Sequence, residues 1–320
     1  MSTVVKIWLI IAASLILLGC IIFGGVMTGL KWDFSKLSTA KYETNNYEIN
    51  EEYTDISILT DTADIVFVSS KSQKSSIKLC EQTKAKHSVS VKDGTLVIEM
   101  VDSRKWYEYI GIDLGTQSIT VCIPEGKYGA LLIEGDTGNV KISEEFKFKS
   151  IDICQETGDV SNYASVDNGI KIKTTTGDIS VKNVSSRSLE LYVSTGKVNI
   201  SDVNCDGNIN IGLSTGKAYL NDASCKKLMS SGSTGDIFLT NVVAEEKISI
   251  KRSTGDVKFD SCDSKEILVN TNTGSVKGSL LSGKIFITKT STGDISVPEA
   301  SSGGKCEITT STGDISITIK

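Results

Sequence analysis

A Thr-Gly pair recurs ten times along this chain, at steps of 19 or 20 residues. The glycines of these pairs are Gly138, Gly158, Gly177, Gly196, Gly216, Gly235, Gly255, Gly274, Gly293 and Gly313. A domain built around one mixed core needs no such period, whereas a chain that coils over itself with one turn per repeat does. The period therefore predicts a stack of repeated coils.

Apolar residues keep fixed positions around each glycine, which we number zero. Positions −7 and −5 and positions +2 and +4 are usually apolar, as in Ile170, Ile172, Ile179 and Val181 around Gly177. Spacing by two is the periodicity of a strand with one face on a core. Position +7 is also small or apolar. Each repeat is therefore predicted to hold two short strands, a bend at the glycine and a third inward point.

The inward-facing parity changes across the glycine, so the chain must bend there, and glycine reaches backbone angles that other residues avoid. Helical repeats are excluded because no apolar stripe has a 3.6-residue period, and propeller blades need about 40 residues. The sequence predicts an all-β fold, a single-chain parallel β-helix or β-solenoid of 19–20-residue coils. We expect a right-handed coil, because connections between parallel strands usually have that hand.

Near the N-terminus, residues 7–30 are apolar and uncharged, after a short tail at residues 1–6. As a helix this segment spans about 36 Å, enough to cross a bilayer. We expect one transmembrane α-helix that binds the lipid bilayer, then a polar stalk at residues 31–52. The protein is then a single-pass protein of the cell membrane with an extracytoplasmic solenoid, although lysines at both ends of the segment leave the orientation open.

Two other interpretations of this segment remain. A cleaved signal peptide would have a shorter apolar core and a small-residue cleavage site. The run Leu17-Leu18-Gly19-Cys20 resembles a lipoprotein cleavage box, in which Cys20 would receive lipid, but the apolar residues continue beyond it. We therefore favour an uncleaved anchor.

Residues 53–133 alternate apolar and polar residues without the regular Thr-Gly pair. We interpret them as irregular opening coils of the same solenoid, because terminal repeats that cap a stack are atypical. The regular ten-repeat solenoid is expected over residues 134–320. We expect its last coil to expose its edge, with Lys320 as a charge that discourages edge pairing.

Two features of the solenoid allow two interpretations each. The aromatic residues Trp106, Tyr107 and Tyr109 form either a ligand patch or a cover over the open end of the core. Cys205 and Cys225 share position +9 in neighbouring coils, so they are expected to stack, either as a disulfide or as small buried hydrophobes.

The composition indicates neither nucleic-acid binding nor catalysis. The net charge is −5 with both signs interspersed, so there is no basic stripe. The one histidine, His87, lies in no nucleophile motif and is expected at the surface or in a turn. Aspartates at position +1 would form either a calcium ladder or a solvated turn, and Lys197 and Lys217 in the same column oppose a cation. We expect no enzyme, no cofactor and no metal.

The repeated Thr-Gly-Asp-Ile unit, at residues 176–179, 234–237 and 292–295, resembles the bacterial "putative adhesin" family, a domain of unknown function. The lead-in at residues 119–124, Ile-Thr-Val-Cys-Ile-Pro, is similar to it as well. The resemblance covers about residues 50–320. It implies a β-helical domain that is often tethered to the bacterial envelope, and it implies no catalytic residues.

Two functions are compatible with these observations. The first is a membrane-anchored extracytoplasmic scaffold that binds protein or glycan surfaces, because outward side chains repeated every ~4.8 Å suit multivalent weak binding. The alternative, which the resemblance implies, is an envelope-stress sensor or regulator that acts through its anchor and membrane partners. Ligand identity and oligomeric state remain open at this point.

Overall fold

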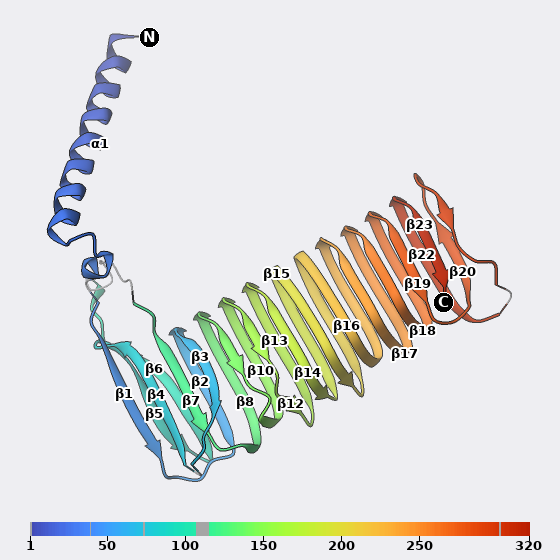
Figure 1. Cartoon of the computed structure of the whole chain (residues 1–320), viewed down its shortest axis with the longest axis horizontal. Helices are drawn as coiled ribbons and strands as arrows, with labels where there is room; N and C mark the ends of the chain where they lie inside the picture. Colours follow the sequence, from blue (N-terminus) through green and yellow to red (C-terminus); the bar gives the residue numbers. More distant parts are fainter. Residues whose placement is uncertain (1, 39, 73, 107–114, 301) are drawn as a thin grey trace.

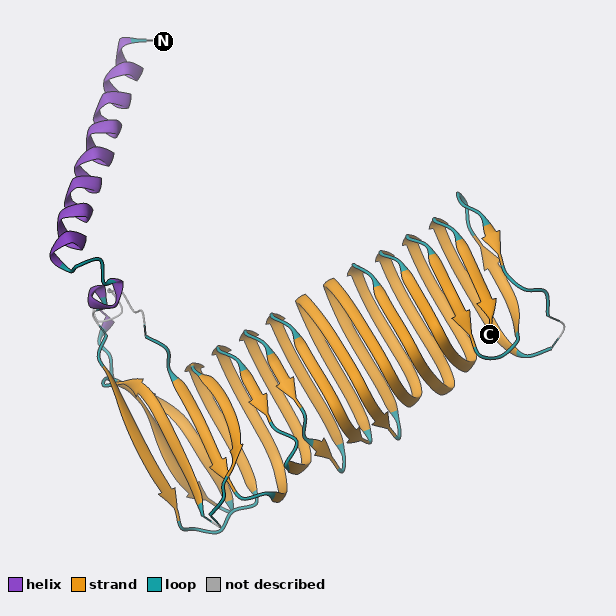
Figure 2. Cartoon of the chain, viewed as in Figure 1, coloured by secondary structure: helices purple, strands orange, loops and turns teal. Residues whose placement is uncertain are grey.

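The computed structural model describes residues 2–38, 40–72, 74–106, 115–300 and 302–320. Figure 1 shows an N-terminal helix followed by a long rod of stacked strands, and Figure 2 shows that the rod consists almost entirely of strand. The prediction of an all-β solenoid with 19–20-residue coils, preceded by one apolar helix, is confirmed.

Helix α1 spans Thr3–Gly29 and begins with Ser2, whose hydroxyl accepts a hydrogen bond from the backbone N–H of Val5. It has a mean hydropathy of 2.7 and nearly all its side chains are exposed. Its 27 residues rise about 40 Å. Length and composition are those of a membrane-crossing helix or a signal sequence. A short 3-10 helix, η1 (Phe34–Leu37), follows.

The stack opens with an antiparallel cap. In the cap, β1 pairs with β4, β4 with β7, and β5 with β6, all antiparallel. Strands β2 and β3 then pair in parallel with β8 and β9, where the regular coils begin. The bounds are β1 (Tyr42–Ile49), β2 (Asp55–Thr62), β3 (Asp64–Ser69), β4 (Ser75–Gln82), β5 (Ala85–Lys92), β6 (Thr95–Asp102), β7 (Ser118–Ile123), β8 (Gly126–Thr137) and β9 (Val140–Ile142).

This cap differs from two expectations. Residues 53–133 hold one early turn, β2–β3, together with antiparallel hairpins, where we expected irregular coils only. Strand β1 brings part of the 31–52 segment, expected as a polar stalk, into the sheet. Its sequence, YETNNYEI, hides a strand because only Tyr47 and Ile49 pack against the core, between polar residues.

From β8 onward the chain winds in parallel turns, and the longer strands run through a bend without a break. The bounds are β10 (Phe146–Thr157), β11 (Val160–Asn162), β12 (Ser165–Val166), β13 (Gly169–Thr176), β14 (Ile179–Ser186), β15 (Ser188–Cys205), β16 (Asn208–Thr234), β17 (Ile237–Thr254), β18 (Val257–Thr273), β19 (Val276–Leu280), β20 (Lys284–Lys289), β21 (Ile295–Ser296), β22 (Gly304–Thr312) and β23 (Ile315–Ile319).

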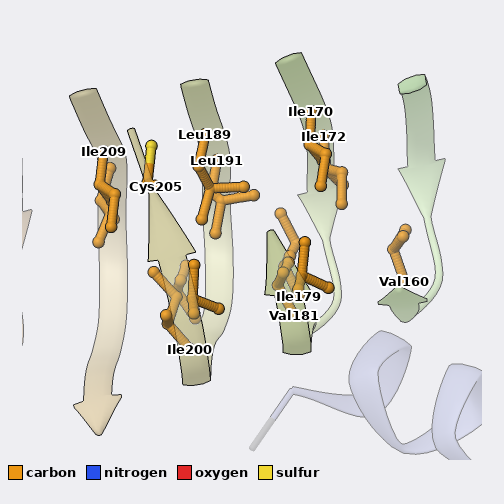
Figure 3. Close-up of a cluster of buried hydrophobic side chains, with 14 of the residues drawn as sticks. Val160, Ile170, Ile172, Ile179, Val181, Leu189, Leu191, Ile200, Cys205 and Ile209 are labelled. Carbon is orange, nitrogen blue, oxygen red and sulfur yellow. The ribbon is translucent and has the colours of Figure 1, made fainter. Parts of the chain in front are cut away.

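The predicted inward positions form the core. Ile170 pairs with Leu189 and Leu189 with Ile209, each directly above the last. Figure 3 shows this column opposite the column of Ile179, Val181 and Ile200. All of these side chains are buried. Because every inward residue packs on its counterparts in both neighbouring coils, stacking supplies the contacts that a lone coil lacks.

Each coil turns at three corners. At the first, all ten Thr-Gly glycines have φ between 124° and 152°, and an added Cβ would collide with the carbonyl oxygen of an adjacent coil. The second corner is at position +6, where the left-handed region is occupied by Asn183, Asp202, Asp222, Asn241 and Ser261, with φ of 52–57°. Asn and Asp tolerate this conformation best among non-glycine residues. At the third corner some coils carry an extra residue, which produces the 19- and 20-residue periods.

The last two coils are exchanged in space relative to their order in the sequence. Strand β22 pairs with β18 on one side and with β20 on the other, and β23 likewise lies between β19 and β21. The coil of β20 and β21 therefore forms the end of the rod. Our expectation that the coil ending at Lys320 exposes its edge is wrong, and the ammonium of Lys320 bonds Asp260 at 2.6 Å.

A difference in core residues accounts for this order. The inserted coil places Cys306, Ile308 and Ile315 in the inward slots, where all are 0% exposed. The end coil has the polar Thr288 at the position equivalent to Ile308. The more apolar coil thus takes the slot that is covered on both sides.

Candidate binding surfaces

The aspartates at position +1 serve as links between coils. A carboxylate oxygen of Asp159 accepts the backbone N–H of Asp178 at 2.8 Å, and Asp178 accepts that of Lys197 at 2.8 Å. Asp236 and Asp256 repeat the pattern further along the rod. Among the residues that the structure describes, no group of three or more His, Cys, Asp or Glu side chains could hold a metal ion. The column thus has a structural role.

His87 lies in a buried polar cluster of the cap, so its expected place at the surface or in a turn is wrong. Its Nε2 lies 2.9 Å from the Thr60 hydroxyl and its Nδ1 lies 2.9 Å from a Glu81 carboxylate oxygen. Asn45 of β1 donates to the other carboxylate oxygen at 2.8 Å. This order of groups matches a nucleophile, a base and an orienting acid. Thr60 is 6% exposed and His87 3%, which closes the hydroxyl to a substrate, so the cluster ties β1, β2, β4 and β5 together.

An aromatic pair with lysines lies on the outside of the rod at position +3. The rings of Tyr219 and Phe238 stack with centroids 5.0 Å apart and planes 7° apart. The ammonium groups of Lys217 and Lys258 lie 5.8 and 5.2 Å from the Phe238 centroid. The hydrogen bond between Lys217 and Asp236 raises the pKa of Lys217. Such cation–ring contacts favour the charged lysines near the aromatic surface.

A groove of about 300 Å³ adjoins this pair and is lined by Phe238, Lys258, Lys277 and Gly278, among others. We call the hollow, its lining residues Phe238, Lys258 and Lys277, and the stacked Tyr219 the aromatic–lysine groove. Lys277 is held by Asp314 at 2.9 Å, while the Lys258 ammonium lies over the ring. The groove offers a flat apolar surface beside positive charges, which suits a ring-shaped or anionic group on a partner.

A second hollow lies on the other side of the Thr-Gly bend, around Gly212. The Tyr192 ring leans over this glycine, since an added Cβ there would lie 2.6 Å from the ring. Serines and lysines such as Ser231 and Lys251 line the adjoining surface. Tyr192 is 39% exposed. This hollow lies on a different side of the bend from the aromatic–lysine groove and serves below as a comparison.

Beneath it lies a buried cation that the sequence analysis missed. Arg252 is 2% exposed and occupies the space that a side chain at Gly232 would fill. Its guanidinium donates to the Leu213 carbonyl at 3.3 Å and to the Ser230 hydroxyl at 2.9 Å. Burial lowers the pKa of Arg252. The pairing of a glycine with a long polar residue in the next coil, repeated at Gly135 and Gln155, is a signal that the sequence does carry.

The remaining predicted residues are only partly placed. Trp106 is 77% exposed, whereas Tyr107 and Tyr109 lie outside the described residues. Cys205 and Cys225 are both buried, both are free thiols, and burial raises the pKa of Cys225 to about 12. Of the two interpretations, the structure therefore favours small buried side chains over a disulfide for these two cysteines.

Stacked coils with a Thr-Gly bend make this protein a β-solenoid, and one apolar helix precedes the solenoid. The family model described as Toastrack DUF4097 matches residues 53–216 and 206–320. The chain belongs to the Toastrack DUF4097 family. The expected resemblance to the "putative adhesin" family is thereby confirmed.

Several solved structures are similar to this chain at low identity. A "putative adhesin" from Bacteroides fragilis NCTC 9343 is 15% identical, with 87% of this chain and 97% of that one covered and a TM-score of 0.41. A "putative lipid binding protein" from Parabacteroides distasonis ATCC 8503 is 17% identical, with 88% and 98% covered and a TM-score of 0.48. A "putative adhesin" from the same organism is 10% identical, with 88% and 98% covered and a TM-score of 0.44. No curated protein matches the sequence.

Proposed function

We propose that this protein is a membrane-anchored extracytoplasmic scaffold, without catalytic activity, that binds protein or glycan surfaces through the outward side chains of its rod. The observation that carries the proposal is the aromatic–lysine groove, which successive coils build on one face of the stack. The apolar helix α1 supports the anchor, and the names of the similar solved structures support a role at the cell surface.

The rod is well suited to present such a surface. Each coil is bonded to its neighbours along all its strands, so outward residues keep their spacing instead of adapting to a ligand. Partners with repeated groups would then engage several coils at once, which raises the overall affinity without any strong single contact.

Binding is tested by applying the full chain in detergent to glycan arrays and to whole bacterial cells. Phe238→Ser removes the centre of the aromatic–lysine groove, while Tyr192→Ser removes an exposed ring on the other side of the bend. The proposal predicts that Phe238→Ser lowers binding about tenfold or more, as for loss of a central aromatic contact, and that Tyr192→Ser leaves it unchanged. Equal binding by all three proteins would contradict it.

The anchor and the orientation are tested on intact cells. An epitope placed after Lys320 is predicted to be accessible to added protease, and the protein is predicted to stay with the membrane after a high-salt wash. An inaccessible epitope would refute the extracytoplasmic placement. Replacing residues 7–30 by an unrelated anchor should preserve surface binding; a loss of function after this exchange would favour the regulatory alternative.

A further inference from the structure

The end of the rod formed by β20 and β21 exposes the core that every other coil covers. Ile295 occupies position +2 and is 46% exposed, whereas the equivalent Val257 and Ile315 are 0% exposed. Phe286, at position −7, is only partly buried. Ile285 and Ile287 add exposed apolar surface, at 45% and 51%. This end therefore presents a cross-section of the core to solvent.

The same end presents an open strand edge. Among the described residues, β20 pairs only with β22, and β21 only with β23. Charges that usually protect such edges are confined to the ends of β20, because residues 285–288 carry none and the exposed Lys289 ends the strand. The Lys284 side chain is 3% exposed and turned to Asp263, 2.5 Å away. The edge is thus a template for a further strand.

We propose that this end, the β20–β21 tip, is a homotypic interface that joins two copies of the chain end to end. A covering layer must continue the stack with the same cross-section, and the tip of a second copy has that shape. The opposite end of the rod has a different build, since its strands β1 and β4 pair antiparallel and do not continue the coil cross-section. The contact is therefore isologous, with each tip pairing antiparallel to the other across a two-fold axis.

Two copies joined in this way lie in line, with their N-terminal helices at opposite ends of the pair. Ten coils at ~4.8 Å give each stack about 48 Å, so the joined stacks span about 100 Å. Resting on the proposed membrane anchor, this arrangement links two facing membranes. The tip then supplies the partner for a surface scaffold: the same protein on another membrane.

The size of the tip sets the strength of one contact. A side of about eight residues is ~26 Å long, and the opposing walls are ~10 Å apart, or ~20 Å with the outward side chains of both walls, so each tip buries roughly 500 Å². The total of about 1,000 Å² is at the low end for a specific interface. A single pair is thus expected to be weak, and many pairs between two membranes would act together.

The test is the mass of the full chain in detergent, measured by light scattering across a concentration series. Ile295→Lys places a charge at the joined core, and it is compared with Met229→Lys, an outward residue in a middle coil with 42% exposure. We expect the unaltered protein and Met229→Lys to dimerise alike, and Ile295→Lys to raise the dimer dissociation constant at least about tenfold. Unfolding midpoints of the two variants should agree, since both residues are exposed.

Two results would overturn the proposal. One is an unaltered protein that stays monomeric at all concentrations, which would leave the tip to a strand from a different protein. The other is dimerisation of Ile295→Lys equal to that of Met229→Lys, which would assign the dimer to another surface such as α1. Neither result affects the epitope test of the proposed function, so the two can fail separately.

Discussion

Replacing Gly235 by alanine tests how closely the coils approach at the Thr-Gly bend. The added Cβ would lie 1.7 Å from the Gly216 carbonyl oxygen, where ordinary contact begins at 3.4 Å. The two coils must therefore move apart, at the expense of hydrogen bonds between them such as Ala218 N–H to the Asp236 carbonyl at 3.0 Å. Two lost bonds cost about 2 kcal/mol, and φ of +124° adds about 2 kcal/mol for a residue with a side chain. We expect a loss of about 4 kcal/mol in the free energy of unfolding.

Two matched variants separate these contributions. Gly94 has φ of +74° but nothing within 4 Å of an added Cβ, so Gly94→Ala tests the backbone conformation alone; it should cost about 1–2 kcal/mol. Gly126 has neither constraint, so Gly126→Ala should lie within about 0.5 kcal/mol of the unaltered protein. The assay is urea unfolding of the full chain in detergent, followed by circular dichroism. Equal losses for Gly235→Ala and Gly94→Ala would refute the role assigned to close coil approach.

Three further predictions concern single contacts. Gly135→Ala would place its Cβ against the Gln155 amide oxygen, so it should cost about 1–2 kcal/mol alone and much less in a Gln155→Ala background, and an additive double-mutant cycle would contradict this. Burial raises the pKa of the Cys306 thiol to about 12 from 9.0. Alkylation of Cys306 at pH 8 should therefore be about 1,000-fold slower than for an ordinary thiol, and it should accelerate as the pH rises and the thiolate forms. An alkylation rate equal to that of the exposed Cys154 would contradict this prediction. Lys284→Met leaves Asp263 without its cation, so hydrogen exchange should speed up in β20 while β13–β17 keep their protection; unchanged exchange in β20 would show that the pair does not hold the end coil.

Periodicity reveals most of the coil from the sequence, because the inward positions must repeat wherever coils stack. The glycine bend follows from the change in parity, and Ile170 and Ile179 illustrate how reliably alternation marks the core. The second corner was also encoded, since Asn or Asp recurs at position +6, as at Asn183 and Asp202, but position +6 carries no apolar signal and was overlooked.

Features that depend on comparing distant segments could not be predicted in this way. The exchange of the last two coils rests on a small difference in packing, Thr288 against Ile308, which periodicity treats as equal positions. The antiparallel cap was not predicted because strands such as β1 show the same alternation of apolar and polar residues as the coils and differ only in the strand with which they pair. His87 was misplaced because the cap strands, which the repeat pattern does not predict, bring Thr60 and Glu81 to its ring.

Removal of residues 197–235 tests the account most directly. This deletes 39 residues (235 minus 196), two whole coils, and joins Gly196 to Asp236 in the register of an ordinary repeat. If the stability of each coil depends on its immediate neighbours alone, the backbone amides of strands β13 and β18 in the deletion variant will be as protected from hydrogen exchange as in the unaltered protein. Loss of protection throughout the rod would contradict the stacked-coil account.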